Sequence, residues 1–445
     1  EKSFLNMARS NNWNLSKSAK VFTSLSISVL VAYLIPRYFS PIMETLVLVS
    51  KEKHFLYTIC FGFSFLVFGE MTGVLDQNFK SLSFRHFLLF LLSSILASLV
   101  LLLVVWIFEY KFIGRYAILK IGFFAGFGNF LLFWFFNLLA QKNPLKILLN
   151  TSLENEEKLK KDFKNLPFEI YSLQGENSSS EEEVIKLCSK NEIDLVVMEN
   201  GLGKDKLEII PFLQLGTRVM GIVEFYENYL EKIPVVHVDQ SWLARLDLRF
   251  RDPLSHKFKR ILDIMIGFFG LIFTFPLIIS ALLITALESG FPVFFSQNRT
   301  GFLGQPYILF KIRTMRVNAE EKNAKWAEEN DNRVTVAGSF LRKWRIDEIP
   351  QFWNVIKGEM SIVGPRPERP EFQDRLIKKV PHWNCRHLVK PGLTGWAQIK
   401  FRYASDMESS EEKLAYDLYY IKHASILMDI QIILSTLRSL AKGSR

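Results

Sequence analysis

The sequence predicts a membrane protein of the α plus α/β class, with four transmembrane helices, a Rossmann-like soluble module and a mainly α C-terminal domain on a re-entrant helix. Three observations support this prediction. The 445 residues are 49% hydrophobic and include 40 Phe, and the apolar residues gather in long runs typical of membrane proteins. Strand-like and helix-like segments alternate in the middle of the chain. A later apolar run contains a proline near its middle, which kinks a helix.

The charge of the chain points to lipids and phosphates. The formal net charge is +10, and the basic residues flank the apolar runs. Anionic headgroups and phosphorylated substrates explain that placement better than nucleic acid does, so we expect no nucleic-acid partner. The three cysteines, Cys60, Cys188 and Cys385, show neither a CxxC pair nor a metal-ligand spacing, so we expect no disulfide framework.

Residues 1–143 are predicted to form the transmembrane domain. Apolar runs lie near 21–36, 54–75, 86–108 and 117–140. A helix needs about 20 residues to cross a bilayer, and only the first run is short for this. An even number of spans returns the chain to its starting side, and the basic residues favour the cytoplasm as that side.

Residues 144–238 are predicted to form the soluble module, because the composition changes sharply at Asn143-Pro144. Strands are expected at 146–149, 168–173, 194–198, 217–223 and 235–238, with helices at 154–163 and 181–190. This alternation indicates a parallel sheet. The residues after the first strand are 150–153, Asn-Thr-Ser-Leu, and not GxGxxG, so we expect no dinucleotide.

A linker, 239–256, leads to the C-terminal domain, 257–445, whose apolar run 261–287 contains Pro276. Basic residues stand on both sides of this run, which places both of its ends on one membrane face. A broken helix that enters the membrane and returns to the same face satisfies that condition, and a straight span is the alternative.

Asp263 lies four residues after Lys259 at the start of the run, and the two are expected to form an i, i+4 ion pair.

Residues 338–367 carry the candidate chemistry. Ser339 is expected to cap a helix that ends near Arg345, with Phe340, Leu341 and Trp344 on one apolar face. Because Pro350 is tolerated only in a first turn, a second helix is expected to begin at 347–349. Asp347 and Glu348 then lie at a helix N-terminus.

Nearby cations should keep at least one carboxyl of this pair ionised. An ionised, partly desolvated carboxylate can act as a nucleophile, and its neighbour can hold a divalent metal. On Asp347 and Glu348 alone, a helix cap and a solvated acid are the simpler interpretation.

Residues 293–316 are predicted to form a strand pair with a turn at 301–304. Lys311 and Arg313 occupy alternate positions, which would place both cations on one face of an extended strand as a phosphate clamp. Residues 371–388 and 410–440 are expected to be helices that pack on the core or lie in the headgroup layer.

Four motifs in this order resemble the bacterial sugar transferases, the polyprenyl-phosphate hexose-1-phosphate transferases. They are Lys-Ile-Arg-Thr-Met at 311–315, Asp-Glu-Ile-Pro-Gln at 347–351, Gly-Pro-Arg-Pro at 364–367 and Pro-Gly-Leu-Thr-Gly-Trp-Ala-Gln at 391–398. The similarity covers about 257–439. It implies an enzyme that moves a hexose-1-phosphate from a UDP-sugar to undecaprenyl phosphate and releases UMP, at the start of exopolysaccharide, O-antigen or capsule synthesis.

The resemblance also implies roles for individual residues. Asp347 would be the nucleophile that forms a covalent aspartyl-phosphosugar, and Glu348 would bind Mg²⁺. The implied substrate-binding residues are Lys311, Arg313, Arg342, Pro365, Arg366, Pro367 and Arg402. The family places its catalytic domain on the cytoplasmic face of the bacterial inner membrane, in contact with membrane lipid, and the soluble module suggests a homodimer.

Some positions depart from the family pattern. Phe275-Pro276 stands where the family has Ser-Pro, Ile312 replaces an aromatic residue, and Lys400-Phe401 replaces Asn-Gly before Arg402.

Glucose or galactose is the expected sugar, with an N-acetylated hexose as an alternative. Two other classes remain open, an inactive membrane scaffold of the same fold and a nucleotide-sugar glycosyltransferase. The second usually carries an Asp-x-Asp motif, which does not occur in this sequence.

Overall fold

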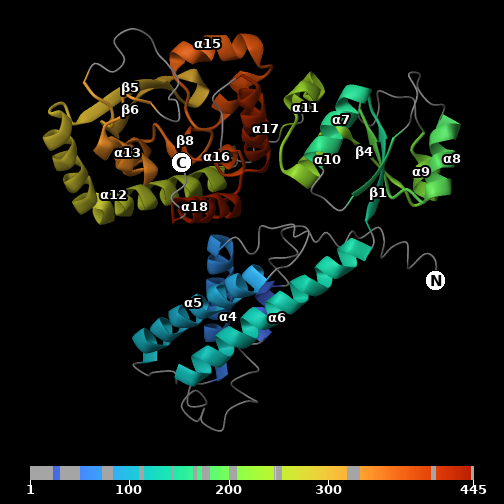
Figure 1. Cartoon of the computed structure of the whole chain (residues 1–445), viewed down its shortest axis with the longest axis horizontal. Helices are drawn as coiled ribbons and strands as arrows, with labels where there is room; N and C mark the ends of the chain where they lie inside the picture. Colours follow the sequence, from blue (N-terminus) through green and yellow to red (C-terminus); the bar gives the residue numbers. More distant parts are fainter. Residues whose placement is uncertain are drawn as a thin grey trace. The chain divides into compact units, whose positions relative to one another are not determined.

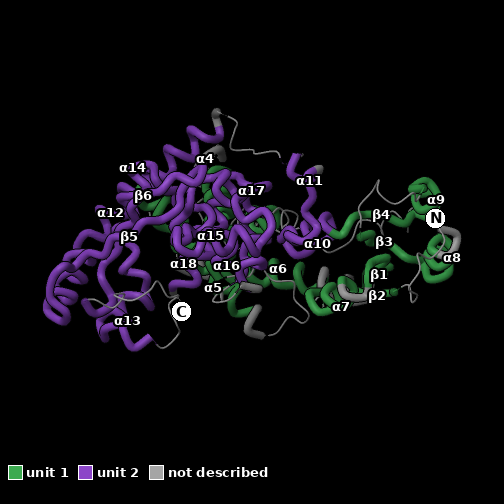
Figure 2. Tube along the Cα trace, turned by 90° about the horizontal axis from the view of Figure 1, so that it is seen from above, with its two compact units in different colours: residues 1–222 green, residues 223–445 purple. Residues whose placement is uncertain are grey.

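The computed structural model describes residues 24–30, 51–72, 84–109, 115–142, 144–163, 168–172, 181–199, 208–244, 246, 253–317, 331–401 and 407–441. The chain divides into two compact units, Glu1–Ile222 and Val223–Arg445 (Figure 2). Each unit is described by itself.

The described residues of the first unit include the long helices α4 (Lys51–Thr72), α5 (Phe84–Glu109) and α6 (Arg115–Lys142). Two segments, Phe55–Thr72 and Phe87–Phe108, are long and apolar enough to cross a membrane, whereas the apolar part of α6, Lys120–Phe135, is shorter. Residues 24–30 are helical, and the rest of the first expected run lies outside the described residues. The count of four transmembrane helices therefore stays a prediction.

Polar contacts join the first apolar run to the fourth. Ser24 Oγ donates a hydrogen bond to Asn129 Oδ1 (2.7 Å), and Asn129 Nδ2 donates to Ser28 Oγ (3.0 Å). All three side chains are buried. Hydrogen bonds of this kind hold helices together where no hydrophobic driving force exists between them.

The middle of the chain forms a four-stranded parallel sheet. Its elements are β1 (Leu145–Asn150), α7 (Leu153–Asp162), β2 (Phe168–Ser172), α8 (Glu181–Asn191), β3 (Leu195–Met198), α9 (Ile210–Gln214) and β4 (Arg218–Gly221). The strand order is β2-β1-β3-β4, which matches the first four strands of 2-1-3-4-5, one of the common doubly wound orders. In the register, Leu145 is opposite Phe168 and Ile147 is opposite Leu195. Four of the five expected strands are present.

The start of α7 already has an anionic partner. The backbone N–H of Ser152 donates to the Glu199 carboxylate (2.6 Å), and Asn155 Nδ2 donates to the same group (2.8 Å). In doubly wound sheets a ligand phosphate occupies such a helix N-terminus. In this chain, Glu199 supplies the negative charge there.

The expected strand at 235–238 is wrong. After α10 (Ile222–Leu230), this segment contains a 3₁₀ turn, η1 (Val235–His237), followed by α11 (Gln240–Ala244). Val235 and Val238 are buried with Phe372, Trp383 and Leu418 in the core of the second unit. Periodicity cannot distinguish a short apolar run in a strand from one that packs against helices.

After α11, the second unit continues with α12 (Pro253–Ser289), which has Pro276 inside it. Figure 1 shows α12 as two helical arms joined at a bend. Near the bend, Thr274 Oγ1 donates to the carbonyl of Gly270 (2.5 Å), a back-bond of the kind that bends helices. The proline therefore kinks the helix, as predicted.

Both ends of α12 are tied to the same folded unit. Near its start, Lys259 Nζ donates to the Val363 carbonyl (3.2 Å), and at its end Arg313 Nη2 donates to the Ser289 carbonyl (2.8 Å). A straight helix of 37 residues would be about 55 Å long. These two anchors favour a helix that enters the membrane and returns, and the topology in a bilayer stays a prediction.

Much of the surface of α12 is apolar and exposed, including Phe273 (79%) and Leu287 (87%). Ser255–Ser289 is the third described segment that is long and apolar enough to cross a membrane. On the adjacent α13 (Val336–Lys343), Leu341 is buried while Val336 (86%) and Phe340 are exposed. Exposed apolar side chains on neighbouring helices are typical of a surface that contacts lipid.

The remaining elements of the second unit surround the candidate site. The hairpin strands β5 (Phe294–Thr300) and β6 (Pro306–Ile312) are antiparallel and enclose the turn η3 (Phe302–Gly304), as predicted. The short strands β7 (Ser361–Val363) and β8 (Gly392–Thr394) are parallel. The other elements are η4 (Ile346–Glu348), α14 (Gln351–Lys357), α15 (Pro370–Lys379), η5 (Trp383–Leu388), α16 (Trp396–Lys400), α17 (Met407–His423) and α18 (Ile426–Ala441).

Two of the expected helices in this unit are interrupted. The helix expected at 371–388 ends at Lys379 and is followed by a 3₁₀ segment. Pro381 explains the break, because a proline disfavours helical geometry in the residue before it. The helix expected at 410–440 is two helices, α17 and α18. Ser425 Oγ accepts from the Met428 N–H (3.2 Å) and caps the second one.

Candidate active site

The carboxyl pair lies in a 3₁₀ turn between two helices. α13 is capped by Thr335, whose Oγ1 accepts from the Gly338 N–H (2.9 Å), and not by Ser339 as expected. Arg345 follows α13 with a φ of 52°, a left-handed conformation that costs a non-glycine residue about 1–2 kcal/mol. η4 then carries Asp347 and Glu348 directly before α14, whose first helical residue follows Pro350. The pair lies near the N-terminus of α14, as expected, but this helix begins at Gln351 and not at 347–349.

Both carboxylate oxygens of Glu348 are occupied. Oε1 accepts from Arg366 Nη2 (2.7 Å) and from Lys311 Nζ (3.1 Å), and Oε2 accepts from Arg345 Nη1 (3.2 Å). Burial by itself would raise the pKa of Glu348, but the charges of Arg366, Lys311 and Arg345 outweigh it and hold the pKa well below its usual range. Glu348 is therefore ionised and fixed in position.

Asp347 differs from its neighbour. Its side chain is buried, with 6% of the residue exposed, and within the described part of the chain its carboxylate accepts no hydrogen bond. Burial and the adjacent Glu348 charge raise the pKa of Asp347 to about 6, against the opposing effect of Lys311, Arg342 and Arg366. At neutral pH it is an ionised carboxylate without a bonded partner, which is the state a nucleophile needs.

The residues around the pair carry excess positive charge. Lys311, Arg342, Arg345 and Arg366 face two acids, which leaves two net positive charges when both acids are ionised. Burial lowers the pKa of Arg342, and the charge of Asp347 opposes this. Its Nε donates to Thr314 Oγ1 (2.8 Å), which fixes the guanidinium. Such a cluster is complementary to a diphosphate.

Two glycine-containing motifs meet behind Arg366. The Gly364 N–H donates to the Thr394 carbonyl, and the Gly392 N–H donates to the Pro365 carbonyl (both 2.9 Å). A Cβ on Gly364 would lie 2.3 Å from the Lys390 carbonyl oxygen, and one on Gly392 would lie 2.1 Å from the Gly364 nitrogen. Only glycine permits this approach, which braces the turn that carries Arg366.

A buried layer supports the same turn. Arg386 Nη2 donates to the Arg366 carbonyl (2.9 Å) and to Asp417 Oδ2 (2.8 Å). Arg299 Nη1 donates to the Pro367 carbonyl (3.0 Å). Reasoning from the sequence missed Arg386 and Arg299, because their partners are distant in the chain and no local spacing reveals them.

The structure brings most of the predicted site residues together. Asp347, Glu348, Lys311, Arg342 and Arg366 form one cluster, and the prolines of the turn, Pro365 and Pro367, are buried beside it. Arg345 joins them but was not selected from the sequence. Its i, i+3 spacing to Glu348 was the available signal.

Arg313 stands apart from this cluster. Its Nη2 donates to the carbonyls of Ser289 (2.8 Å) and Gly290 (2.6 Å), at the end of α12. Arg313 Nε and Nη1 are buried without a hydrogen-bond partner in the described part of the chain, so a phosphate contact by Arg313 stays a prediction. Arg402 lies outside the described residues.

The expected ion pair between Lys259 and Asp263 is wrong. Asp263 Oδ1 instead accepts from Ser361 Oγ (3.0 Å) and the Ile362 N–H (2.9 Å), and Lys259 pairs with Asp429 (2.5 Å). A buried carboxylate gains more from two fixed donors than from a mobile lysine one helical turn away. Asp263 thus anchors α12 to β7.

The carboxyl pair is also the candidate place for a metal. No group of three or more His, Cys, Asp or Glu residues that could hold a metal ion occurs among the described residues. Mg²⁺, however, is usually held by one or two carboxylates together with water and substrate phosphates. Glu348 fits that smaller requirement as a single ionised carboxylate, and a ligand oxygen becomes available when one of its three cations contacts a substrate phosphate instead.

A buried carboxyl pair inside a cation cluster, on a domain with an exposed apolar helix, is typical of a site that handles phosphates next to a membrane. Residues 254–443 match the family model described as bacterial sugar transferase. The uncharacterized sugar transferase EpsL of Bacillus subtilis is 39% identical over 180 residues, which are 40% of this chain and 85% of that protein. The chain belongs to the bacterial sugar transferase family.

Two longer relatives have more specific names. The UDP-N-acetylgalactosamine-undecaprenyl-phosphate N-acetylgalactosaminephosphotransferase of Aeromonas hydrophila is 36% identical over 225 residues, 51% of this chain and 52% of the relative. The UDP-glucose:undecaprenyl-phosphate glucose-1-phosphate transferase of Escherichia coli (strain K12) is 41% identical over 180 residues, 40% of this chain and 39% of the relative. The chain thus matches about half of the length of these relatives or less.

Proposed function

We propose that this chain is an initiating phosphoglycosyl transferase that moves a hexose-1-phosphate from a UDP-sugar to undecaprenyl phosphate. The observation that supports this most directly is the contrast within η4. Glu348 is held by three cations, whereas the adjacent Asp347 is buried, ionised at neutral pH and unpaired among the described residues. The names of the relatives supply the substrate class.

In the first step, a carboxylate oxygen of Asp347 attacks the phosphorus that bears the sugar. The bond from this phosphorus to the bridging oxygen breaks, and UMP leaves with that oxygen and its electron pair. The product is an acyl phosphate that joins Asp347 to the sugar phosphate. Arg366, Arg342 and Lys311 stabilise the negative charge that develops on the phosphate oxygens.

In the second step, a phosphate oxygen of undecaprenyl phosphate attacks the same phosphorus. The bond to Asp347 breaks, the free carboxylate returns, and the product is a lipid diphosphate sugar. No proton needs to be added or removed in either step. The exposed apolar surface of α12 supports this step, because a membrane-dissolved acceptor would approach along such a surface.

Glu348 is the residue that would hold Mg²⁺ together with the diphosphate. When bound, the ion supplies neutralisation of the diphosphate charge. We further propose that the domain lies on the cytoplasmic face, where UDP-sugars occur, that it acts in polysaccharide synthesis, and that the chain forms a homodimer.

A UMP-release assay tests the reaction. The full-length chain in detergent is given undecaprenyl phosphate, Mg²⁺ and one UDP-sugar at a time, including glucose, galactose and their N-acetylated forms. We expect release with one sugar and loss of at least about 1,000-fold in Asp347→Asn, because a group-transfer step loses its nucleophile. Full activity of that variant would contradict the covalent step.

Two other outcomes would redirect the assignment. No release from any sugar with folded protein would favour the inactive scaffold, and release of UDP instead of UMP would indicate a glycosyltransferase. A matched variant, Arg375→Gln, removes an exposed cation on α15 and is expected to keep full activity.

A further inference from the structure

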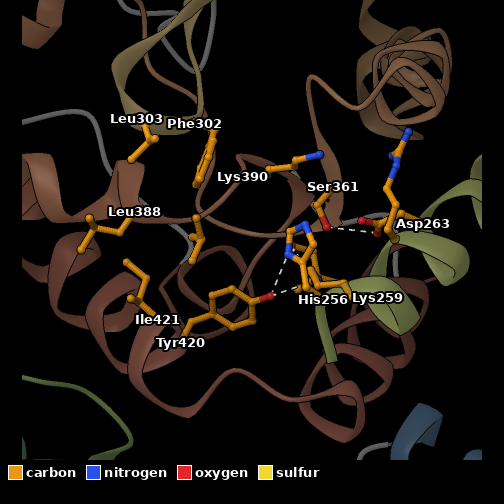
Figure 3. Close-up of a pocket in the computed structure, with 13 residues that line it drawn as sticks. His256, Lys259, Asp263, Phe302, Leu303, Ser361, Leu388, Lys390, Tyr420 and Ile421 are labelled. Atoms are coloured by element: carbon orange, nitrogen blue, oxygen red, sulfur yellow. Dashed lines mark hydrogen bonds between the residues drawn. The ribbon is translucent and has the colours of Figure 1, made fainter. Parts of the chain in front are cut away.

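A cavity lies beside the start of α12, and it is separate from the carboxyl pair. Its volume is about 250 Å³, and no residue of the cluster around Asp347 lines it. Figure 3 shows its two kinds of wall. Lys390, His256 and Lys259 lie on one side, and Leu303, Leu388 and Ile421 lie on the other.

Two cations of the polar wall are held in place by the protein. Lys259 pairs with Asp429 (2.5 Å) and donates to the Tyr420 hydroxyl (3.3 Å). Arg260 donates to the carbonyls of Val355 and Ile356 at the end of α14, each at 2.6 Å. Their charges therefore stay at the cavity wall whether or not a ligand is present.

Lys390 is different, because it has neither a hydrogen bond nor an ion pair in the described part of the chain. Its Nζ and Arg260 Nη2 lie 3.5 Å and 3.2 Å from the place of a Cβ on Gly358, so two positive groups lie close together. Burial and the Arg260 charge lower the pKa of Lys390, and Asp263 opposes this effect. An anion between the two cations would relieve their repulsion.

The two acids near this cavity, Asp263 and Asp429, do not act as the anion between Lys390 and Arg260, because each already has other partners. Asp263 accepts from Ser361 Oγ and the Ile362 N–H, and Asp429 is engaged by Lys259 and by the Tyr420 hydroxyl (2.7 Å). The cavity and its surroundings therefore contain three cations, Lys259, Arg260 and Lys390, and two acids that already have partners, so the net charge there is positive.

The opposite wall and its surroundings are apolar. Leu303 is 63% exposed, and Phe302 next to it is also exposed. Along α12, the lining residues Lys259 and Arg260 are followed at once by the exposed Ile261. The cationic end of the cavity thus lies at the border of the lipid-facing surface, the depth at which lipid headgroups sit.

We propose that this cavity binds the phosphate group of a membrane lipid, with Lys390 as the main contact and the hydrocarbon chain along Leu303 and Leu388. The ligand chemistry is a phosphate monoester or diester that has a net negative charge and carries a long apolar chain. A bulk anionic phospholipid and a polyprenyl phosphate share this chemistry. The site is separate from the active-site cluster and stands whether or not the transfer reaction is correct.

Native mass spectrometry of the full-length chain in non-ionic detergent tests this site. Phosphatidylglycerol, undecaprenyl phosphate, phosphatidylcholine and inorganic phosphate are titrated separately. We expect the first or the second to bind more tightly than phosphatidylcholine and inorganic phosphate, and Lys390→Gln to weaken that binding by at least about 10-fold, because a charge-assisted contact is lost. The lipid that responds to the substitution identifies the source of the phosphate.

Two further variants keep the experiment decisive. Lys390→Arg preserves the charge and is expected to retain binding. Lys379→Gln removes an exposed lysine on α15 and is expected to leave binding unchanged. Equal lipid binding by Lys390→Gln and the unmodified chain, with unchanged melting temperatures, would overturn the proposal, and so would inorganic phosphate that binds as tightly as either lipid.

Discussion

Replacing the candidate nucleophile should make the protein more stable. The pKa of Asp347 is raised from 3.8 to about 6, chiefly by burial. This difference corresponds to about 3 kcal/mol at about 1.4 kcal/mol per pH unit. Because the folded state disfavours the ionised form, the native chain carries this penalty at neutral pH. Asp347→Asn removes the charge while it keeps the shape, so we expect it to raise the free energy of unfolding by up to about 3 kcal/mol.

The pH dependence of the effect has a definite sign. A carboxyl with a raised folded-state pKa costs nothing below its unfolded pKa of 3.8, and the penalty grows as the pH rises to about 6. Thermal unfolding of the full-length chain in detergent, followed by tryptophan fluorescence, is measured at neutral pH and near pH 4. The Asn variant should melt at a higher temperature at neutral pH, and the difference should vanish near pH 4.

Glu348→Gln is the matched control, since the same chemical change one residue later should act in the opposite direction. It leaves Lys311, Arg345 and Arg366 without their carboxylate, so the melting temperature should fall. An Asp347→Asn variant that melts at or below the temperature of the native chain at neutral pH would refute the burial argument. A gain that persists near pH 4 would refute the assignment of the penalty to ionisation.

Three further predictions follow from the same geometry. The kcat/KM for UMP release should fall as the pH drops below about 6, because Asp347 must be ionised; a flat profile down to about pH 5 would contradict this. Arg386→Gln should lower the free energy of unfolding by about 3–5 kcal/mol, and with it the melting temperature, because Asp417 is left buried without its cation. An unchanged melting temperature would exclude a stabilising role for this ion pair. In a cysteine-free background, Lys257→Cys and Phe291→Cys should react with a membrane-impermeant maleimide from one side only, and the same side for both; labelling from opposite sides would establish a straight span.

Rules that depend only on residues close together in the sequence predicted the elements that carry the site. Pro350 limited where a helix could begin, and Asp347 and Glu348 were therefore expected close to the start of α14, although they lie in the 3₁₀ turn before it and not in its first turn. Pro276 likewise predicted the bend in α12, which Figure 1 shows. These features depend on residues within one or two helical turns, which is the range over which propensity and spacing are informative.

Other parts of the site depend on contacts between distant residues. β7 pairs with β8, Gly364 and Gly392 approach each other closely beside that pairing, and Arg386 donates a hydrogen bond to Asp417 across the core. Strand alternation would have placed Lys311 and Arg313 on one face, but β6 ends at Ile312 and Arg313 turns to the end of α12. No pattern within a single segment reports such pairings.

The measurement that tests the central claim most directly is the trapping of the covalent intermediate. The purified chain is given Mg²⁺ and its UDP-sugar without a lipid acceptor, and its intact mass is recorded before peptide mapping. The account predicts a gain of one hexose phosphate on Asp347, one equivalent of UMP, and loss of the adduct when undecaprenyl phosphate is added. UMP release that requires the lipid from the start, with no adduct or with an adduct on another residue, would contradict it.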